Sequence, residues 1–253
     1  MALLEAEGLV RRFRGLAAVD GLSFTVEEGK TLAVIGPNGA GKTTAFNLIS
    51  GLLAPNAGRV AFRGSDVTRK RAHDRCRMGL GRTFQVVQPF AELDVVGNVM
   101  VGALFGGGAK SVDAARREAL RLCELVGLGA KAAWPVGGLT VPDRKRLELA
   151  RALATRPAVL MLDEVMEGLT PVEEREAVAL LHRIRAEGVT LLLIEHVMST
   201  VRDLSDRVIV MDYGKKIAEG TYAEISRDPK VIAAYLGSEE PMRGAVPPSD
   251  PPA

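Results

Sequence analysis

The sequence predicts an α/β fold with a parallel sheet, an antiparallel β region at its N-terminus and a mostly helical insertion. Strand-like apolar segments alternate with helix-like segments in both halves of the chain, which is typical of parallel sheets with right-handed crossovers. A glycine-rich loop follows one of these buried strands near residue 36. In the middle of the chain, up to Arg156-Pro157, the pattern becomes mostly helical, so we expect one α/β core that is interrupted by a helical section.

Composition limits the class of protein before any motif is considered. The 253 residues are 47% hydrophobic and 25% charged, which are ordinary values for a globular chain. The formal net charge is +2 and aromatic residues make up 4%, so we expect no nucleic-acid partner. Cys76 and Cys123 form no CxxC pair, which favours a reducing compartment and no structural zinc. No apolar run approaches the roughly 20 residues of a membrane helix.

The first third of the chain carries the β region and the glycine-rich loop. An apolar run that ends in glycine, at 31–35, has the pattern of a buried parallel strand. The alternation of the preceding segments is weaker and fits the antiparallel region. The expected strands are 3–14, 18–26, 31–35 and 59–63, and the expected helix is 43–51.

The remaining elements follow the same reasoning. A basic stretch at 69–82 precedes the helical section, and the α/β pattern returns after Arg156-Pro157, which stops a helix. Residues 238–253 are rich in proline without apolar periodicity, and we expect a disordered tail. The expected helices are 112–127, 143–155, 171–187 and 197–204, and the expected strands are 158–162, 189–194, 207–211 and 216–219.

The glycine-rich loop predicts a nucleoside triphosphate site. Residues 36–43, Gly-Pro-Asn-Gly-Ala-Gly-Lys-Thr, fit the pattern G-x-x-x-x-G-K-[ST]. Glycines allow backbone N–H groups to surround phosphate oxygens, Lys42 reaches the β- and γ-phosphates, and the Thr43 hydroxyl ligates Mg²⁺. A glycine-rich turn with an incidental lysine is the alternative. The strand before the loop and the helix after it favour the phosphate-binding interpretation.

Two acidic residues at the end of another strand support this site. Asp163 and Glu164 follow strand 158–162, where a carboxylate is placed to hold Mg²⁺ in a sheet that carries a phosphate loop. We expect Asp163 to be that ligand and Glu164 to orient or deprotonate an attacking water. His196 follows strand 189–194 and could contact the γ-phosphate, although its spacing alone does not distinguish this role from a structural one.

The complete set of motifs resembles the ATPase subunit of an ABC transporter. The resemblance covers about residues 3–237. It implies a P-loop NTPase (RecA-like) core at about 1–86 and 157–237, a helical subdomain at about 87–156, and a tail at 238–253. It also implies ATP and Mg²⁺ as cofactors.

The same resemblance assigns expected roles to individual residues. Phe13 would stack on adenine, and Gln85 would join Thr43 and Asp163 as a ligand of Mg²⁺. The implied catalytic residues are Lys42, Gln85, Glu164 and His196. The implied nucleotide-binding residues are Phe13, Gly36, Asn38, Gly39, Ala40, Gly41, Lys42, Thr43 and Thr44, with Thr140 acting on the nucleotide of a partner.

A narrower resemblance concerns the ATPases of branched-chain amino-acid importers. It rests on Gly81-Arg-Thr-Phe-Gln85, on Leu192-Leu-Ile-Glu-His196 and on the ending Pro229-Lys-Val-Ile-Ala-Ala-Tyr-Leu-Gly237. It implies a motor subunit that imports branched-chain or other hydrophobic amino acids, or related small molecules. It further implies a second ATPase subunit, integral membrane permease subunits, and a cytoplasmic location on the inner face of a bacterial plasma membrane.

The signature motif departs most from the family. The signature Leu-Ser-Gly-Gly-Gln, which presents hydroxyl and N–H groups to the γ-phosphate across a dimer, is replaced here by Leu139-Thr-Val-Pro-Asp143. Thr140 keeps a hydroxyl, but Pro142 has no N–H and Asp143 adds a negative charge. The pattern also fits a capping box. We expect a weak γ-phosphate contact, with Lys145 or Arg146 as the residues that could offset the charge. The alternative is a variant signature that works through different contacts.

Other functions stay open at this point. The altered signature allows a nucleotide-gated subunit with little turnover, and the family also includes non-transport ATPases. The latter usually carry coiled-coil inserts or a duplicated cassette, which this chain lacks. The partner could be a different ATPase subunit or a second copy of this chain. A surface that couples to the membrane subunits is expected near residues 85–98, with Phe90 and Leu93 as candidate contacts.

Overall fold

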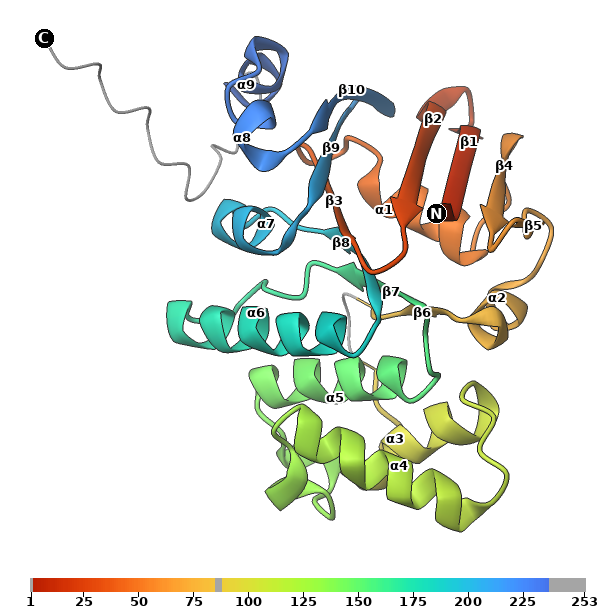
Figure 1. Ribbon diagram of the computed structural model, residues 1–253, viewed down its shortest axis with the longest axis vertical. Helices are drawn as coiled ribbons and strands as arrows, with labels where there is room; N and C mark the ends of the chain where they lie inside the picture. The colour runs from red at the N-terminus through yellow and green to blue at the C-terminus, as the bar shows by residue number, and fades with distance from the viewer. Residues whose placement is uncertain (1, 85–87, 237–253) are drawn as a thin grey trace, which may run out of the picture.

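Two sheets form the framework of the computed structural model, which describes residues 2–84 and 88–236 (Figure 1). One is a four-stranded antiparallel sheet in the order β2-β1-β4-β5, and the other is six-stranded in the order β10-β9-β3-β8-β7-β6. The strands are β1 (Ala2–Phe13), β2 (Leu16–Glu27), β3 (Thr31–Ile35), β4 (Ala57–Phe62), β5 (Ser65–Asp66), β6 (Leu80–Arg82), β7 (Val159–Asp163), β8 (Thr190–Ile194), β9 (Arg207–Asp212) and β10 (Lys215–Gly220).

The six-stranded sheet is parallel except for its edge strand β10. Strands β3, β7 and β8 are buried along their whole length, because helices or the other sheet cover both faces. This burial explains their continuous apolar runs. In the register of the sheet, Val34 pairs with Ile194 and Ile194 with Asp163, so the carboxyl ends of the three strands lie at one edge.

Helices cover the six-stranded sheet and form one end of the molecule. In Figure 1, α3, α4 and α5 lie at the lower end, while the antiparallel sheet lies at the upper right beside α1. One apolar core joins this sheet to α3–α6, and a second fills the space between the two sheets around α1. The helices are α1 (Lys42–Ser50), α2 (Ala72–Met78), α3 (Val95–Phe105), α4 (Val112–Leu125), α5 (Val141–Leu153), α6 (Pro171–Ala186), α7 (Met198–Leu204), α8 (Tyr222–Ile225) and α9 (Pro229–Leu236), with short 3-10 helices η1 (Gly129–Lys131) and η2 (Val136–Gly138).

The predicted fold class is confirmed, and most predicted elements lie within two residues of their expected bounds. The sequence analysis did not anticipate α2 and β6, which lie in the basic stretch at 69–82, or helices α3, α8 and α9. Helix α5 begins two residues earlier than predicted because Thr140 caps it. Helices α3, α4 and α5 lie between β6 and β7, where the helical insertion was expected.

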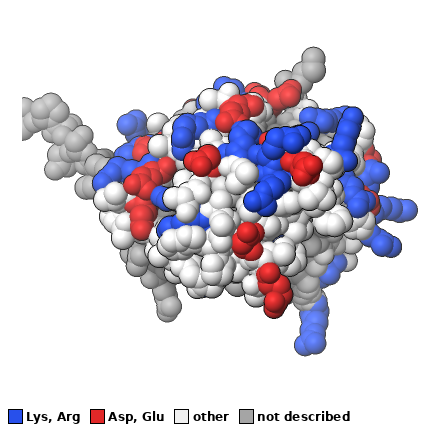
Figure 2. Space-filling view, turned by 90° about the horizontal axis from the view of Figure 1, so that it is seen from below, with Lys and Arg blue, Asp and Glu red and all other residues white. Residues whose placement is uncertain are grey.

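The surface and the helix lengths bear on possible partners. Among the described residues, no helix combines the length and the apolar character that crossing a membrane requires. On the face seen from below Figure 1, acidic side chains lie among the basic ones (Figure 2). This mixture of charges matches the small net charge of the chain.

Candidate functional site: a phosphate loop and the ends of β7 and β8

The loop between β3 and α1 needs glycine at two positions. Gly36 and Gly41 have φ angles of 148° and 99°. A Cβ atom on Gly36 would overlap the carbonyl oxygen of Met211, and one on Gly41 would overlap that of Ala18. Only glycine combines this backbone conformation with so close an approach of a neighbouring strand. The loop is therefore fixed by β2 and β9 on either side.

The same loop presents a lysine and a free helix terminus. The Lys42 ammonium is buried and donates hydrogen bonds to the carbonyl oxygens of Gly36 and Pro37, at 2.6 and 3.0 Å. Within the described ranges no side chain caps α1, so its first N–H groups are available to an anion. Thr43 lies exposed in the first turn of α1 and Thr44 is partly buried beside it.

Asp163 ends β7 with one carboxylate oxygen paired and one left over. Its Oδ2 accepts a hydrogen bond from Arg82 at 2.8 Å, and both side chains are almost completely buried. Its Oδ1 is buried and has no hydrogen-bond partner among the described residues. Arg82 also donates to Asn47 and Ser50 on α1, at 2.6 and 3.0 Å. A buried carboxylate oxygen without a partner suits a hard cation such as Mg²⁺.

Glu164 has a strained backbone. Its φ angle is 49°, in the left-handed region that residues with a side chain rarely adopt. Its N–H donates to the carbonyl oxygen of Ile194 at 3.0 Å, which ties it to the end of β8. Lys145 from α5 donates to the carbonyl oxygen of Glu164 at 3.3 Å. The conformation directs the chain away from the sheet directly after Asp163.

The sheet register brings three of the predicted groups together. Because Val34, Ile194 and Asp163 are neighbours across the sheet, the phosphate loop, Glu164 and His196 all follow the same edge. His196 is partly buried and lies two residues beyond Ile194. The edge therefore combines the N–H groups of the glycine-rich loop, a lysine, two carboxylates and an imidazole.

Phe13 lies near the loop from the side of the antiparallel sheet. It pairs with Leu16 across the β1–β2 hairpin, just before Ala18, whose carbonyl oxygen approaches Gly41. Its ring is 42% exposed, and the Arg11 guanidinium lies 4.8 Å from the ring centroid. An exposed aromatic face beside the loop is available for stacking. The predicted ligand Gln85 lies outside the described residues.

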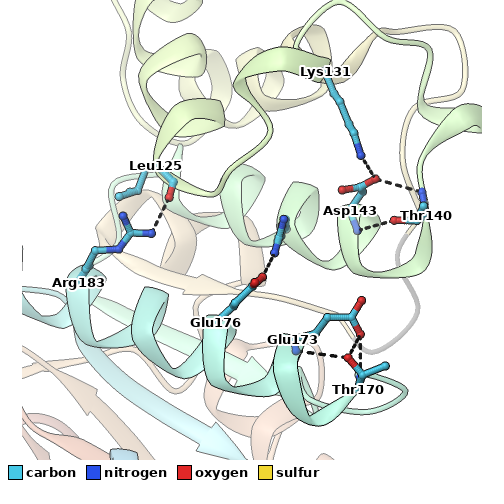
Figure 3. Close-up of polar contacts among 9 residues, drawn as sticks. Leu125, Lys131, Thr140, Asp143, Thr170, Glu173, Glu176 and Arg183 are labelled. Atoms are coloured by element: carbon cyan, nitrogen blue, oxygen red, sulfur yellow. Dashed lines mark hydrogen bonds and ion pairs between the residues drawn. The ribbon is translucent and has the colours of Figure 1, made fainter.

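Thr140 lies apart from this edge, at the start of α5. The capping box is present: Thr140 Oγ1 accepts the N–H of Asp143, and Asp143 Oδ2 accepts the N–H of Thr140, both at 3.3 Å. Asp143 Oδ2 also pairs with Lys131 at 2.5 Å (Figure 3). Burial opposes the change, but the hydrogen bonds from Lys131 and Thr140 lower the pKa of Asp143.

The prediction that Lys145 or Arg146 offsets the charge of Asp143 is wrong. Lys145 is turned toward the loop after Glu164, where it donates to two carbonyl oxygens. Arg146 pairs with Glu176 on α6 at 2.6 Å. Lys131 takes the expected role because the segment before α5 folds back over the start of the helix. The contact joins residues 12 positions apart in a turn that the sequence pattern did not define.

The sequence analysis did not predict the roles of three residues that contact this edge. Arg82 holds Asp163 from β6, the strand beside β7. Lys145 holds the backbone after Glu164. Glu195 is 1% exposed and accepts the N–H of Met166 through Oε1 at 3.1 Å, and burial raises its pKa to about 8. A glutamate within a buried apolar run, directly before His196, was the available signal for Glu195.

Comparison with known proteins places this geometry in a family. The sequence model of the family described as "ABC transporter" matches residues 19–167, and that of "Branched-chain amino acid ATP-binding cassette transporter" matches residues 215–241. The chain is 40% identical to the high-affinity branched-chain amino acid transport ATP-binding protein BraF of Pseudomonas aeruginosa, over 93% of this chain and 98% of that one. It is 39% identical to the corresponding protein LivG of Escherichia coli K12, with the same coverage.

A solved structure shows the same fold. The crystal structure of a nucleotide-free ATP-binding cassette from an ABC transporter superposes with a TM-score of 0.87. The two chains are 32% identical, and the match covers 94% of this chain and all of the other. The family model spans more than half of the chain, and the relatives match almost all of it. The chain therefore belongs to the ATP-binding cassettes of the ABC transporter family.

Proposed function

We propose that this cassette is the ATP-hydrolysing subunit of an importer for branched-chain or related hydrophobic amino acids, on the inner face of a bacterial plasma membrane. The observation that carries the proposal is the common edge at which the phosphate loop, Asp163, Glu164 and His196 meet. The names of the relatives and the second family match, over residues 215–241, support the choice of cargo.

In this proposal the phosphate loop holds the triphosphate of ATP. The N–H groups of residues 36–44 bind phosphate oxygens, and Lys42 exchanges its present carbonyl partners for the β- and γ-phosphates. Phe13 supports the adenine ring. Thr43, Gln85 and the free oxygen of Asp163 would hold Mg²⁺, which neutralises phosphate charge when it is bound.

Hydrolysis requires a group that orients water against the γ-phosphate. Glu164 follows the proposed Mg²⁺ ligand directly, just after the end of β7, and its backbone there is left-handed. We assign it to the deprotonation or orientation of the water, with the water proton passing to its carboxylate. His196, from the adjacent strand end, is assigned to the γ-phosphate.

The contact with the membrane subunits is assigned to the loop around Phe90 and Leu93. Both side chains are exposed, at 46% and 37%. The buried Asn98 side chain holds this loop through hydrogen bonds to Phe90 N–H and to the carbonyl oxygens of Phe90, Leu93 and Asp94. A loop that Asn98 holds in place and that exposes two large apolar side chains suits a partner surface.

The altered signature supports pairing with a different ATPase subunit. Pro142 offers no N–H, and the Asp143 carboxylate places a negative charge in the first turn of α5, where a γ-phosphate would bind. In a dimer, the site that this chain completes for its partner would be weak, whereas its own site would depend on the signature of the partner. A subunit that binds ATP with little turnover is the second candidate, and the same lack of an N–H at Pro142 favours it.

Uptake measurements test the proposal. A host strain that lacks this chain should lose uptake of labelled leucine, isoleucine or valine, and the wild-type gene should restore it. Glu164→Gln should bind ATP yet fail to restore uptake, whereas exposed Arg117→Met on α4 should restore it. Full uptake with Glu164→Gln would favour the nucleotide-gated alternative, and unchanged uptake after deletion would exclude this cargo.

A further inference from the structure

The short loop after Glu164 is held from two sides by side chains of distant parts of the chain. From the end of β8, Glu195 Oε1 accepts the N–H of Met166 at 3.1 Å. From α5, Lys145 Nζ donates to the carbonyl oxygens of Glu164 and Val165, at 3.3 and 3.2 Å. We call Lys145 and Glu195 the loop clamp.

The strain at Glu164 explains why such a clamp is needed. A left-handed backbone at a residue with a side chain costs on the order of 1–3 kcal/mol, and it persists only where surrounding contacts fix it. Here the carbonyl oxygen of Ile194 accepts the N–H of Glu164. The loop clamp holds the carbonyl groups of Glu164 and Val165 and the N–H of Met166. Without those contacts we expect the peptide to relax and the Glu164 carboxylate to move.

Glu195 occupies an environment that is costly for a carboxylate. It is 1% exposed, and its Oε2 has no hydrogen-bond partner in the part of the chain that the structure describes. Burial also raises its pKa. A glutamate gains little packing at such a position, and its one hydrogen bond in the described chain beyond its own strand end goes to the loop after Glu164. That contact favours a role in placing the loop.

Lys145 connects the loop to a different part of the molecule. It lies in the second turn of α5, the helix that begins at the altered signature with Thr140 as its N-cap. A displacement of α5 would pull on the two carbonyl groups that Lys145 holds. The loop clamp thus links the position of α5 to the backbone of Glu164.

We propose that Lys145 and Glu195 are positioning residues for hydrolysis, which hold Glu164 in its productive backbone conformation and make that conformation depend on α5. The inference rests on the proposed role of Glu164. Neither residue belongs to the phosphate loop or to the proposed Mg²⁺ ligands, so their loss should lower the rate of hydrolysis and leave the affinity for ATP unchanged.

The test compares variants of the full-length chain. Lys145→Met removes the donor and keeps the stem, and Glu195→Leu removes the acceptor. Glu195→Gln keeps an acceptor oxygen for Met166, and Arg117→Met is the exposed cation-to-methionine control. The readouts are the dissociation constant of a fluorescent ATP analogue, single-turnover hydrolysis with the assembled ATPase pair in excess over ATP, and hydrogen exchange of residues 164–168.

We expect Lys145→Met and Glu195→Leu each to slow hydrolysis by roughly 10- to 100-fold, the effect of misplacing a reacting group by about 1 Å, with unchanged ATP affinity. Exchange of the Met166 amide should accelerate in both, and Glu195→Gln should recover most of both losses. The double variant should be no slower than the slower single variant, because both residues hold one loop.

Two results would overturn the inference. One is wild-type hydrolysis and exchange in Lys145→Met, and the other is a Glu195→Gln variant as slow as Glu195→Leu. Glu164→Gln, measured in parallel, tests the proposed function separately: if that variant hydrolyses ATP normally, the assigned base is wrong whatever the clamp variants do. If Glu195→Leu does not fold, Lys145→Met and Glu195→Gln still decide the matter.

Discussion

A single buried charge secures the helix that carries the phosphate loop. Arg75 on α2 is 1% exposed and donates to the carbonyl oxygens of Leu48, Ile49, Thr68 and Lys70, at 2.6–3.1 Å. Two of these carbonyls end α1, the helix that begins at the phosphate loop. Burial lowers the pKa of Arg75 to about 10, so it stays charged at neutral pH. A cation at the C-terminal end of a helix is favourable.

We predict that Arg75→Met destabilises the protein by about 3 kcal/mol, because several buried carbonyl groups lose their partner at once. The exposed Arg77→Met on the same helix should change the free energy of unfolding by less than about 0.5 kcal/mol. Urea denaturation measures both. Equal effects of the two substitutions would show that Arg75 does not secure the end of α1.

Glu195 predicts a pH dependence of stability. Burial raises its pKa to about 8 from the ordinary 4.5, so the folded state holds a proton that the unfolded state has lost between these values. The stability contributed by this proton is complete below pH 4.5 and declines as the pH rises to about 8, by on the order of 1 kcal/mol per unit. Glu195→Gln should lack this decline. The free energy of unfolding of both proteins is measured from pH 5 to 8. The same pH dependence in wild type and Glu195→Gln would contradict the prediction.

Functional residues could be predicted from the sequence where they belong to a contiguous motif, but not where tertiary contacts define them. Lys42 and Thr43 belong to a loop whose chemistry is readable from spacing alone. The partners of Arg75, Arg82 and Lys145 lie on other elements, and no local pattern announces them. The residue that pairs with the Asp143 carboxylate, Lys131, was predicted wrongly for the same reason.

Whole elements were predictable where burial was uniform. Strands β3, β7 and β8 are continuous apolar runs because both faces of the sheet are covered. The three residues of β6 are too few to show a period, and they lie at the end of a basic stretch. Helix α3 lacks charged residues and contains glycines, so it carries no amphipathic pattern.

The residues at the start of α5 stabilise the helix, but they differ from those that would bind a γ-phosphate best. We predict that the variant Thr140→Ser, Pro142→Gly, Asp143→Gln loses about 1 kcal/mol of stability, because the ion pair with Lys131 and the N-terminal proline are removed. It should also raise ATP hydrolysis at the site that this chain completes for its partner. Denaturation and hydrolysis by the assembled ATPase pair measure the two effects. No gain in hydrolysis at saturating ATP would show that the native signature is already competent.

At the scale of the molecule, a groove separates part of the helical section from the core. A space of about 440 Å³ lies between α5 and α6, and it is lined mainly by apolar side chains. Across this region Arg146 pairs with Glu176, and Arg183 donates to the carbonyl oxygen of Leu125 at 3.2 Å (Figure 3). An incompletely filled boundary favours movement of α5 relative to the core, which the loop clamp would transmit to Glu164.

The fold class and the family were readable from the sequence, because the motifs occur in a fixed order along one chain. The division into a core and a helical subdomain at residues 87 and 156 stays a prediction. The groove and the loop clamp could not be foreseen, since each depends on how elements far apart in the chain pack together.

The most direct test of the account is the turnover of Mg²⁺-ATP by the assembled ATPase pair, measured beside the same pair with Glu164→Gln in this chain. The account predicts steady hydrolysis by the wild-type pair and its loss, with ATP binding retained, in the variant. Hydrolysis that survives in Glu164→Gln would contradict the assignment of the base, and tight binding without turnover by the wild-type pair would contradict a subunit that hydrolyses ATP.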